Sequence, residues 1–218
     1  MRKLVVNTFL TLDGVMQAPG GPDEDPSGGF AHGGWSVPHW DDGMGERMGE
    51  FMGQPFDLVL GRKTYEIFAA HWPHATEEAG AKPLNDATKH VASRTLTSLE
   101  WQNSVLIEGD VIEAVGRLKQ QDGPELQVHG SANLLQTLIG SGLIDRFNLW
   151  TFPIVVGPGK RLFDEGVVPA SLQLVDSFTS STGVVMGTYV PAGDLVTGSF
   201  ALEEPTEAEL ERRRNLDP

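Results

Sequence analysis

The fold is decided by the stretch Phe56-Asp57-Leu58-Val59-Leu60-Gly61-Arg62-Lys63-Thr64-Tyr65-Glu66. Its first five residues form an apolar run typical of a buried strand, and Gly61 ends this run where a helical pattern begins. A helix that begins at the end of a strand exposes its first backbone N–H groups, which attract an anion. Because Arg62 and Lys63 add two positive charges at this point, the junction predicts a phosphate-binding site.

Two further segments end a strand with groups that suit an anion. One is the junction Leu126-Gln127-Val128-His129-Gly130-Ser131-Ala132-Asn133-Leu134-Leu135, where small residues open a second helix. The other is Val91-Ala92-Ser93-Arg94, a short strand that ends in a hydroxyl and a guanidinium. Three such strand ends in one chain predict a dinucleotide ligand.

The composition limits the class of protein. The chain has 218 residues, a net charge of −14 and no cysteine. A strongly negative surface repels nucleic acids and anionic membranes, and without cysteine there is no disulfide or thiolate chemistry. The first residues lack the apolar length of a signal peptide, and no run approaches the ~20 apolar residues that span a bilayer. We therefore expect a cytoplasmic protein that binds neither nucleic acid nor membrane.

Strand and helix patterns alternate along the chain, which predicts a mostly parallel sheet in a three-layer α/β domain. We expect strands over 3–9, 56–60, 89–92, 104–107, 125–129, 146–156, 172–178 and 184–189, and helices over 42–53, 64–70, 110–121 and 132–139. A Gly/Pro-rich loop of residues 18–35 follows the first strand, and another loop runs through Pro83. Residues 1–193 form the expected domain, and residues 194–218 form a charged tail that is helical over 203–214.

Six motifs, in this order, carry a resemblance to a known family. They are Leu10-Thr11-Leu12-Asp13-Gly14-Val15, Leu60-Gly61-Arg62-Lys63-Thr64-Tyr65-Glu66, Lys89-His90-Val91-Ala92-Ser93-Arg94-Thr95-Leu96, Val128-His129-Gly130-Ser131-Ala132-Asn133-Leu134, Gly142-Leu143-Ile144-Asp145, and Pro153-Ile154-Val155-Val156-Gly157-Pro158-Gly159-Lys160-Arg161-Leu162-Phe163. From Lys3 to about Tyr189 the chain resembles the dihydrofolate reductase-like family, in the branch related to the riboflavin-biosynthesis reductase (RibD C-terminal) domain. The resemblance implies a mostly parallel central sheet with antiparallel C-terminal strands and flanking helices, an NADPH-dependent reductase, and a homodimer. Apolar segments such as Leu149-Trp150-Thr151-Phe152, which we expect to exceed what one core can cover, agree with a homodimer.

The resemblance implies that the helix opened by Gly61 and the turn at Ser93 hold the adenosine 2′-phosphate of NADPH. The residue types agree with this role. Arg62 and Arg94 can each fork onto phosphate oxygens, Lys63 supplies a point charge, and the hydroxyls of Thr64 and Ser93 can complete the oxygen cage. Either arginine alone would more often be an ordinary surface cation, so the prediction depends on the group.

A second helix start is expected to hold the pyrophosphate. The small residues Gly130, Ser131 and Ala132 let the backbone approach closely, and Asn133 and Leu134 continue the same turn. Dihydrofolate reductases usually have two adjacent glycines at this place, whereas this chain has glycine followed by serine. We also expect Gly157 to line the cofactor cleft, although Gly157-Pro158-Gly159 could serve only to shape a loop.

Hydride transfer needs a proton source, and the sequence offers several. Asp13 could contact the nicotinamide and substrate or could simply form a turn. Asp41 and Asp42 are candidate proton donors, with His39 a third, although one or both aspartates could instead cap the next helix. Trp35 and Trp40 could stack on a planar substrate, or they could be core residues. These alternatives stay open at the level of sequence.

Metal binding is not expected. His32, His39, Asp41 and Asp42 offer mixed ligands, and His71 with His74 offers a helical pair, but neither group has the spacing of a known site. The sequence therefore predicts an NADPH-dependent reductase of a small planar nitrogen heterocycle, pyrimidine-like or pterin-like, as in the reduction of 5-amino-6-(5-phosphoribosylamino)uracil. Dihydrofolate reductase activity and a non-catalytic ligand-binding module are the alternatives, because fold alone does not separate them.

Overall fold

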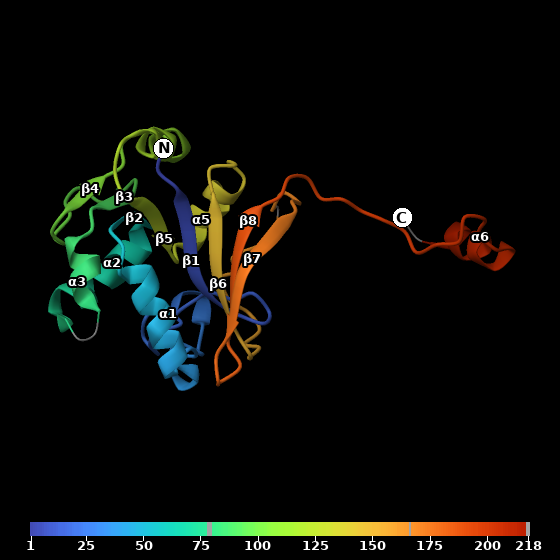
Figure 1. The fold of residues 1–218 in the computed structure, drawn as a ribbon, viewed down its shortest axis with the longest axis horizontal. Helices are drawn as coiled ribbons and strands as arrows, with labels where there is room; N and C mark the ends of the chain where they lie inside the picture. Colours follow the sequence, from blue (N-terminus) through green and yellow to red (C-terminus); the bar gives the residue numbers. More distant parts are fainter. Residues whose placement is uncertain (78–79, 166, 217–218) are drawn as a thin grey trace.

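The protein is described by a computed structural model that covers residues 1–77, 80–165 and 167–216. Its centre is one eight-stranded sheet with the strand order β4-β3-β2-β5-β1-β6-β8-β7 (Figure 1). The strands are β1 (Leu4–Thr11), β2 (Phe56–Gly61), β3 (Lys89–Ala92), β4 (Ser104–Leu106), β5 (Glu125–His129), β6 (Arg146–Phe152), β7 (Leu172–Thr179) and β8 (Val185–Pro191). Strands β1 to β6 pair in parallel, and β8 and β7 add an antiparallel end. The predicted sheet is confirmed.

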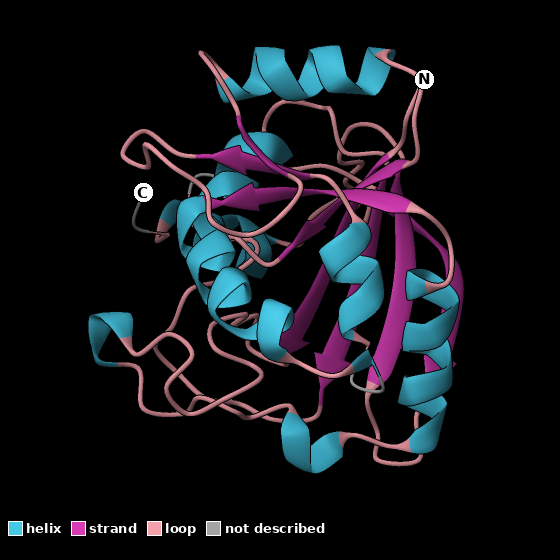
Figure 2. Ribbon diagram, turned by 90° about the vertical axis from the view of Figure 1, so that its left-hand side faces the viewer, coloured by secondary structure: helices cyan, strands magenta, loops and turns pink. Residues whose placement is uncertain are grey.

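Helices cover both faces of this sheet, which gives the three layers (Figure 2). The helices of the chain are α1 (Asp42–Met52), α2 (Arg62–His71), α3 (Ala81–Asp86), α4 (Val111–Gln120), α5 (Ala132–Ile139) and α6 (Glu207–Arg214), with short 3-10 turns η1 (Ser27–Gly29), η2 (Val37–His39) and η3 (Trp72–His74), and α6 lies away from the sheet. Apolar residues of α4 and α5 pack with β1, β5 and β6 on one face, while α1 packs on the opposite face with β6 and β8. Helix α2 and α3 share a third cluster with β2 and β3.

The register of the parallel strands brings their carboxyl ends together. Gly61 at the end of β2 pairs with Ala92 at the end of β3, and His129 at the end of β5 pairs with Asn7 of β1. Because parallel strands all run in the same direction, the segments that follow β2, β3 and β5 leave the sheet at the same edge. Ligands of open α/β sheets bind at this edge.

Some predicted boundaries differ from the structure, and one predicted loop contains a helix. Strand β6 ends at Phe152 rather than at residue 156, because Pro153 has no N–H to continue the ladder. The loop expected through Pro83 contains α3, which follows the left-handed Gly80 and buries Ala81 and Leu84. Proline fits there because the first turn of a helix needs no N–H donor.

The tail helix also begins later than expected. Helix α6 starts after Thr206, whose side chain accepts a hydrogen bond from the N–H of Glu209 at 3.3 Å, as an N-cap does. None of its residues is buried, and Figure 1 shows α6 at the end of an extended segment that leads away from β8. The division into a domain of residues 1–193 and a tail of residues 194–218 stays a prediction.

Candidate functional site

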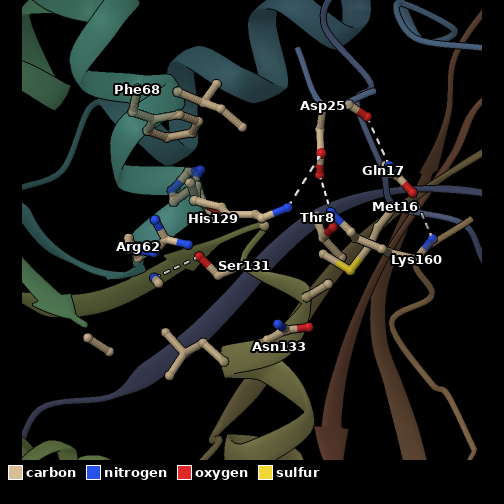
Figure 3. A pocket seen from close by; sticks show the side chains of 18 of the residues that line it. Thr8, Met16, Gln17, Asp25, Arg62, Phe68, His129, Ser131, Asn133 and Lys160 are labelled. Carbon is tan, nitrogen blue, oxygen red and sulfur yellow. Dashed lines mark hydrogen bonds and ion pairs between the residues drawn. The ribbon is translucent and has the colours of Figure 1, made fainter. Parts of the chain in front are cut away.

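A cleft of about 790 Å³ lies at the carboxyl edge of the parallel strands. This volume is within the range of cofactor and small-molecule pockets. Of the residues expected to bind a cofactor, those that line the cleft are Gly61, Arg62, Lys63, Thr64, Ser93, Arg94, Gly130, Ser131, Ala132, Asn133 and Leu134. Figure 3 shows Arg62, Ser131 and Asn133 on one side, with Asp25 and Lys160 across from them. The structure thus brings the three predicted strand ends into a single site.

The ends of β2 and β5 are joined directly. The backbone N–H of Gly61 donates to the hydroxyl oxygen of Ser131 at 2.9 Å. A Cβ atom added at Gly61 would lie 3.4 Å from Cβ and Oγ of Ser131, so the two turns are in close contact. Gly130 and Ser131 both have left-handed backbone angles, with φ of 63° and 68°. Glycine adopts this conformation freely, whereas serine does so at a cost.

Two of the helices that begin at the cleft, α2 and α5, have no side-chain caps. Asp41 caps α1 and Asp110 caps α4, each by accepting hydrogen bonds from first-turn N–H groups. Gly61 before α2 has no side chain, and Ser131 before α5 does not cap that helix. The first N–H groups of α2 and α5 therefore have no side-chain acceptor. Phosphate oxygens are suitable acceptors for such groups.

The two arginines of the cleft, Arg62 and Arg94, have only weak local partners. The guanidinium of Arg62 donates to Glu66 at 3.2 Å within α2, and both side chains are 45% exposed. Such exposed pairs contribute little to stability, so Arg62 is free to change partner. Arg94 is exposed beside Ser93, whose hydroxyl oxygen accepts from the N–H groups of Thr95 at 3.1 Å and Leu96 at 3.0 Å. These contacts hold the turn that presents Arg94.

The opposite wall is built by the Gly/Pro-rich loop. The Lys160 ammonium donates to the carboxylate of Asp25 and to the hydroxyl of Ser27 at 2.8 Å. Gln17 holds the loop in place, because its Nε2 donates to the carbonyls of Asp25 and Ser27, both at 2.9 Å. Lys63 reaches across from α2 and donates to the Ser27 hydroxyl at 3.2 Å. Asp25 thus lies between two ammonium groups (Figure 3).

The two acids of this wall have opposite pKa shifts. Burial tends to raise the pKa of Asp25, but the hydrogen bonds from Lys160 and Ser27 outweigh it, and the pKa is lowered. Burial raises the pKa of Glu24, even though the N–H groups of Gly20 and Gly21 donate to its carboxylate. Asp25 is therefore ionised near neutral pH, as the partner of a cation.

One end of the cleft is apolar. Phe9 of β1 stacks on Trp150 of β6 with ring centroids 5.2 Å apart, and Met48 and Phe51 of α1 complete the surface. The main chain places Phe9 and Trp150 in register on adjacent strands, so they share one face of the sheet. A planar ring can stack against such a surface.

Asp13 and Gly157 lie outside the cleft lining. The carboxylate of Asp13 accepts from the Thr11 hydroxyl at 2.6 Å and from the N–H of Gly157 at 2.9 Å. Burial tends to raise the pKa of Asp13, but these hydrogen bonds lower it on balance. Both residues therefore fix the turn after β1 against the segment after β6, and we do not include them in the proposed site.

Asp41 and Asp42 also lie away from the cleft lining. One carboxylate oxygen of Asp41 accepts from the N–H of Met44 at 2.8 Å, and the other accepts from the hydroxyl and the N–H of Ser181, both at 2.7 Å. The hydrogen bond from the Ser181 hydroxyl is the main cause of its lowered pKa. Asp42 is exposed in the first turn of α1. Asp41 therefore has the capping role that was the alternative at the level of sequence.

The two tryptophans differ in their surroundings. Trp35 is only 7% exposed, donates from Nε1 to the carbonyl of Gln17 at 2.8 Å, and packs edge-on against Phe152. It is a core residue, and it supports the loop that carries Asp25. Trp40 is 44% exposed and stacks on Trp150 with centroids 6.0 Å apart, behind the cleft lining.

Asp25, Lys160 and His129 are among the cleft residues that the sequence analysis did not predict. Asp25 lies in a loop without periodicity, so nothing indicated which of its acids faces a ligand. Lys160 lies within one of the six motifs that carry the family resemblance, directly after Gly157-Pro158-Gly159. This position was the sequence feature that could have indicated a functional role. His129 directly precedes Gly130 in the second predicted junction. Its place as the last strand residue could have indicated that it lies in the cleft.

The described residues contain neither a group of metal-ligating side chains nor a membrane-spanning helix. In the segments with described placement, no three or more His, Asp and Glu side chains are grouped so that they could hold a metal ion. Within the same segments, no helix has the length and apolar character needed to cross a bilayer.

Similar proteins were found by sequence. YyaP of Bacillus subtilis (strain 168), an uncharacterised protein, is 29% identical over 196 residues, which cover 86% of this chain and 94% of YyaP. YwjB of the same organism, also uncharacterised, is 28% identical over 117 residues, which cover 54% of this chain and 63% of YwjB.

Similar solved structures show the same fold. A candidate riboflavin biosynthesis protein from Shewanella sp. PV-4 has a TM-score of 0.62 at 20% identity, with 87% of this chain and 99% of that chain covered. A pyrimidine reductase-like protein from Corynebacterium diphtheriae has a TM-score of 0.59 at 13% identity, with 88% and 93% covered. Dihydrofolate reductase from Enterococcus faecalis, solved with NADP(H), has a TM-score of 0.53 at 15% identity, with 87% and 96% covered.

These structures confirm the dihydrofolate reductase-like fold. A model of the RibD C-terminal domain family matches residues 2–186, which include every strand of the cleft. The chain belongs to the RibD C-terminal domain family.

Proposed function

We propose that this protein is an NADPH-dependent reductase of a small planar nitrogen heterocycle, pyrimidine-like or pterin-like. The observation that carries the proposal is the convergence of Arg62, Lys63 and Arg94 with two uncapped helix starts on one cleft. The chain has a net charge of −14, so three cations gathered in one cleft indicate a site for an anionic ligand. The family and the reductases with this fold agree with a reductase role.

The residues of the cleft fit the charged parts of NADPH. Arg62 and Arg94 would bind the 2′-phosphate, with Lys63 and the hydroxyls of Thr64 and Ser93 beside them. The pyrophosphate would accept from the first N–H groups of α5, where Gly130 lets the chain approach closely. Since Lys63 also contacts Ser27, phosphate binding would compete with that contact.

The pair of Lys160 and Asp25 is our proposed proton source, in place of the three aspartates expected from the sequence. Bound NADPH would supply the hydride, and the neighbouring heteroatom of the substrate then needs one proton. The Lys160 ammonium would donate this proton, while the ionised Asp25 holds the ammonium in place. Lys160 would regain its proton from water. The stacked Phe9 and Trp150 would support the planar ring of the substrate.

We also propose a homodimer, through a surface other than the one expected. The sequence suggested that the apolar segment of β6 would be too large for one core to cover. In the structure its residues Leu149, Trp150 and Phe152 are buried within this chain, so that segment does not support a dimer. Exposed apolar side chains occur on the edge hairpin, where Leu174 and Val175 of β7 are 50% and 51% exposed. A sheet edge of this kind is a surface that proteins normally cover. Sedimentation with and without Leu174→Lys tests whether this edge is an interface.

The function is tested in two steps. Calorimetry with NADPH and NADH measures whether the cleft prefers the 2′-phosphate, and the expected result is tighter binding of NADPH by at least tenfold. NADPH oxidation is then followed with a panel of heterocycles that includes 5-amino-6-(5-phosphoribosylamino)uracil, other pyrimidines, pterins and dihydrofolate. Equal affinity for both cofactors would contradict the assignment of the arginines. NADPH binding without oxidation by any member would instead favour a non-catalytic ligand-binding module.

A further inference from the structure

His129 is a partly buried, titratable residue of the cleft that the proposed hydride and proton steps do not use. It is the last residue of β5, it lies level with Asn7 of β1, and it is among the cleft-lining side chains in Figure 3. Burial lowers its pKa to about 4, so the imidazole is neutral near pH 7. A neutral imidazole has one N–H donor and one bare acceptor nitrogen, and its partners decide which is which.

A chain of hydrogen bonds along β5 fixes the tautomer. The guanidinium of Arg146 donates to one oxygen of the Glu125 carboxylate at 2.6 Å, and a carboxylate paired with a cation only accepts hydrogen bonds. The group of Gln127 that lies 3.2 Å from the other Glu125 oxygen must therefore be the amide NH₂. This leaves the carbonyl oxygen Oε1 of Gln127 facing Nε2 of His129 at 2.8 Å. Because Oε1 can only accept, Nε2 must carry the hydrogen.

The other neighbour of Nε2 does not change this conclusion. Nδ2 of Asn7 lies 3.4 Å from Nε2, which is too long to compete with the 2.8 Å contact to Gln127. Asn7 itself is oriented by Asn148, whose Nδ2 donates to Oδ1 of Asn7 at 2.7 Å. His129 is thus held between two strands with its donor nitrogen already occupied.

The acceptor nitrogen Nδ1 is open to the cleft. No described residue makes a hydrogen bond to Nδ1. The fully buried side-chain atoms without a partner in the described residues are Nε2 of His90 and Oγ of Ser104. Since Nδ1 of His129 is not among them, it is accessible to solvent. A bare acceptor repels phosphate oxygens and attracts an N–H group. We propose that Nδ1 of His129 accepts a hydrogen bond from a ring N–H or amino group of the heterocyclic substrate, and so selects substrates that have a donor at this edge.

The donor is assigned to the substrate rather than to the cofactor because of what surrounds His129. The cations and helix starts that suit phosphates belong to the segments after β2, β3 and β5. His129 lies at the end of β5, before the turn that leads to α5. It is on the sheet face that carries Asn7, Phe9 and Trp150. A planar ring stacked at Phe9 and Trp150 would point its edge along this face. The inference rests on the proposed function, because it takes the occupant of this end to be the reducible heterocycle.

The test compares two probes that differ only at the donor positions. Lumazine has ring N–H groups, and 1,3-dimethyllumazine has methyl groups in their place. Calorimetry on the protein saturated with NADP⁺ should show lumazine binding about tenfold tighter than its dimethyl analogue. His129→Phe should remove this preference, while His129→Gln, which retains an acceptor, should keep part of it. NADPH affinity should be the same in all three proteins.

Several results would overturn the inference. One is the same preference in wild type and His129→Phe, and another is no binding of lumazine to the NADP⁺-loaded protein. A loss of NADPH affinity in His129→Phe would assign Nδ1 to the cofactor instead. Failure of NADPH to bind the wild type would count against the proposed function, not against the tautomer.

Nitrogen-15 NMR of labelled histidine decides the tautomer without any ligand, even if the variants fail to fold. At pH 7 the wild type should show a protonated Nε2 and an unprotonated Nδ1 at His129. The reverse assignment, or a protonated imidazolium, would contradict the inference. Gln127→Leu should change this pattern to a mixture of tautomers, because it removes the acceptor that holds the Nε2 hydrogen.

Discussion

The hydroxyl oxygen of Ser131 accepts the backbone N–H of Gly61 at 2.9 Å, and this bond joins the ends of two strands that are far apart in the sequence. The serine has a left-handed backbone with φ of 68°, a conformation that costs roughly 1–2 kcal/mol for a residue with a Cβ. Its hydroxyl hydrogen is not used by this bond. It can therefore be donated to a phosphate oxygen in the cleft.

Ser131→Ala should destabilise the protein more than Ser131→Gly. Both changes remove the hydrogen bond to Gly61, which contributes about 1 kcal/mol, but only glycine also relieves the left-handed strain. We expect a loss of about 1–2 kcal/mol for alanine and a change near zero for glycine. Urea denaturation measures both. If the hydroxyl donates to the pyrophosphate, both variants bind NADPH about fivefold more weakly. Unchanged NADPH affinity in both would remove Ser131 from the cofactor site.

The double variant Arg62→Ala, Arg94→Ala should distinguish the two nicotinamide cofactors. Each guanidinium contact to a phosphate is a charge-assisted hydrogen bond of about 1.5–3 kcal/mol, so NADPH affinity should fall by about two orders of magnitude or more. NADH lacks the 2′-phosphate, and its affinity should change by less than about threefold. The control is Arg117→Ala with Arg214→Ala, which removes the same charge from outside the cleft lining. Equal losses for both cofactors would refute the assignment.

Lys160→Met and Asp25→Asn should lower the turnover of the substrate found in the panel by about 10²-fold or more, the usual contribution of a positioned acid. The KM for NADPH should stay within about threefold, because neither residue is assigned to its phosphates. Asp13→Asn and Asp41→Asn are matched controls that should leave turnover unchanged. Asp41→Asn should keep the cap of α1, since asparagine caps as well as aspartate, but should lower stability slightly because its amide NH₂ replaces one of the two oxygens that accept from Met44 and Ser181. If a control lowers turnover and Lys160→Met does not, the proton source is misassigned.

Asp145→Asn should lower stability by about 2 kcal/mol at pH 7. The carboxylate accepts from the Lys119 ammonium at 2.6 Å and from the N–H of Leu4 at 2.8 Å. Burial tends to raise the pKa of Asp145, but the bond from Lys119 and the N–H of Leu4 lower it overall.

A lowered pKa sets the direction of the pH dependence. The contribution of Asp145 is fully present above its unfolded value of 3.8 and is lost as the pH falls through the lower folded value. The stability difference between wild type and Asp145→Asn should therefore be constant from pH 7 to pH 5 and shrink below pH 3.8. Thermal melts across this range measure it. A difference that disappears already at pH 5 would contradict the assigned shift.

Much of the architecture could be predicted because strand and helix periodicities are local. The apolar run before Gly61 and the small residues after His129 each specify a strand followed by a helix, whatever the rest of the chain does. The errors occurred where local patterns are weak. Helix α3 depends on burying Ala81 and Leu84 against other elements, and a proline at Pro83 obscured it.

The site was predicted on one side only. The residues expected to bind the cofactor follow strands, so their positions are set by the sheet. The acids of the other wall lie in the loop after β1, whose conformation depends on Gln17, Trp35 and Lys160. No spacing rule connects Asp25 with Lys160, since their contact is made between segments 135 residues apart. Asp13 and Asp41 have suitable chemistry but are already bound to backbone N–H groups.

By itself, the sequence determined the order of the strands and of most helices along the chain and the three strand ends that suit anions, because these depend on neighbouring residues. Only the tertiary structure decided which carboxylate faces the cleft and which nitrogen of His129 is free. Both depend on hydrogen bonds between side chains of different segments, and those bonds form only after the sheet has brought the segments together.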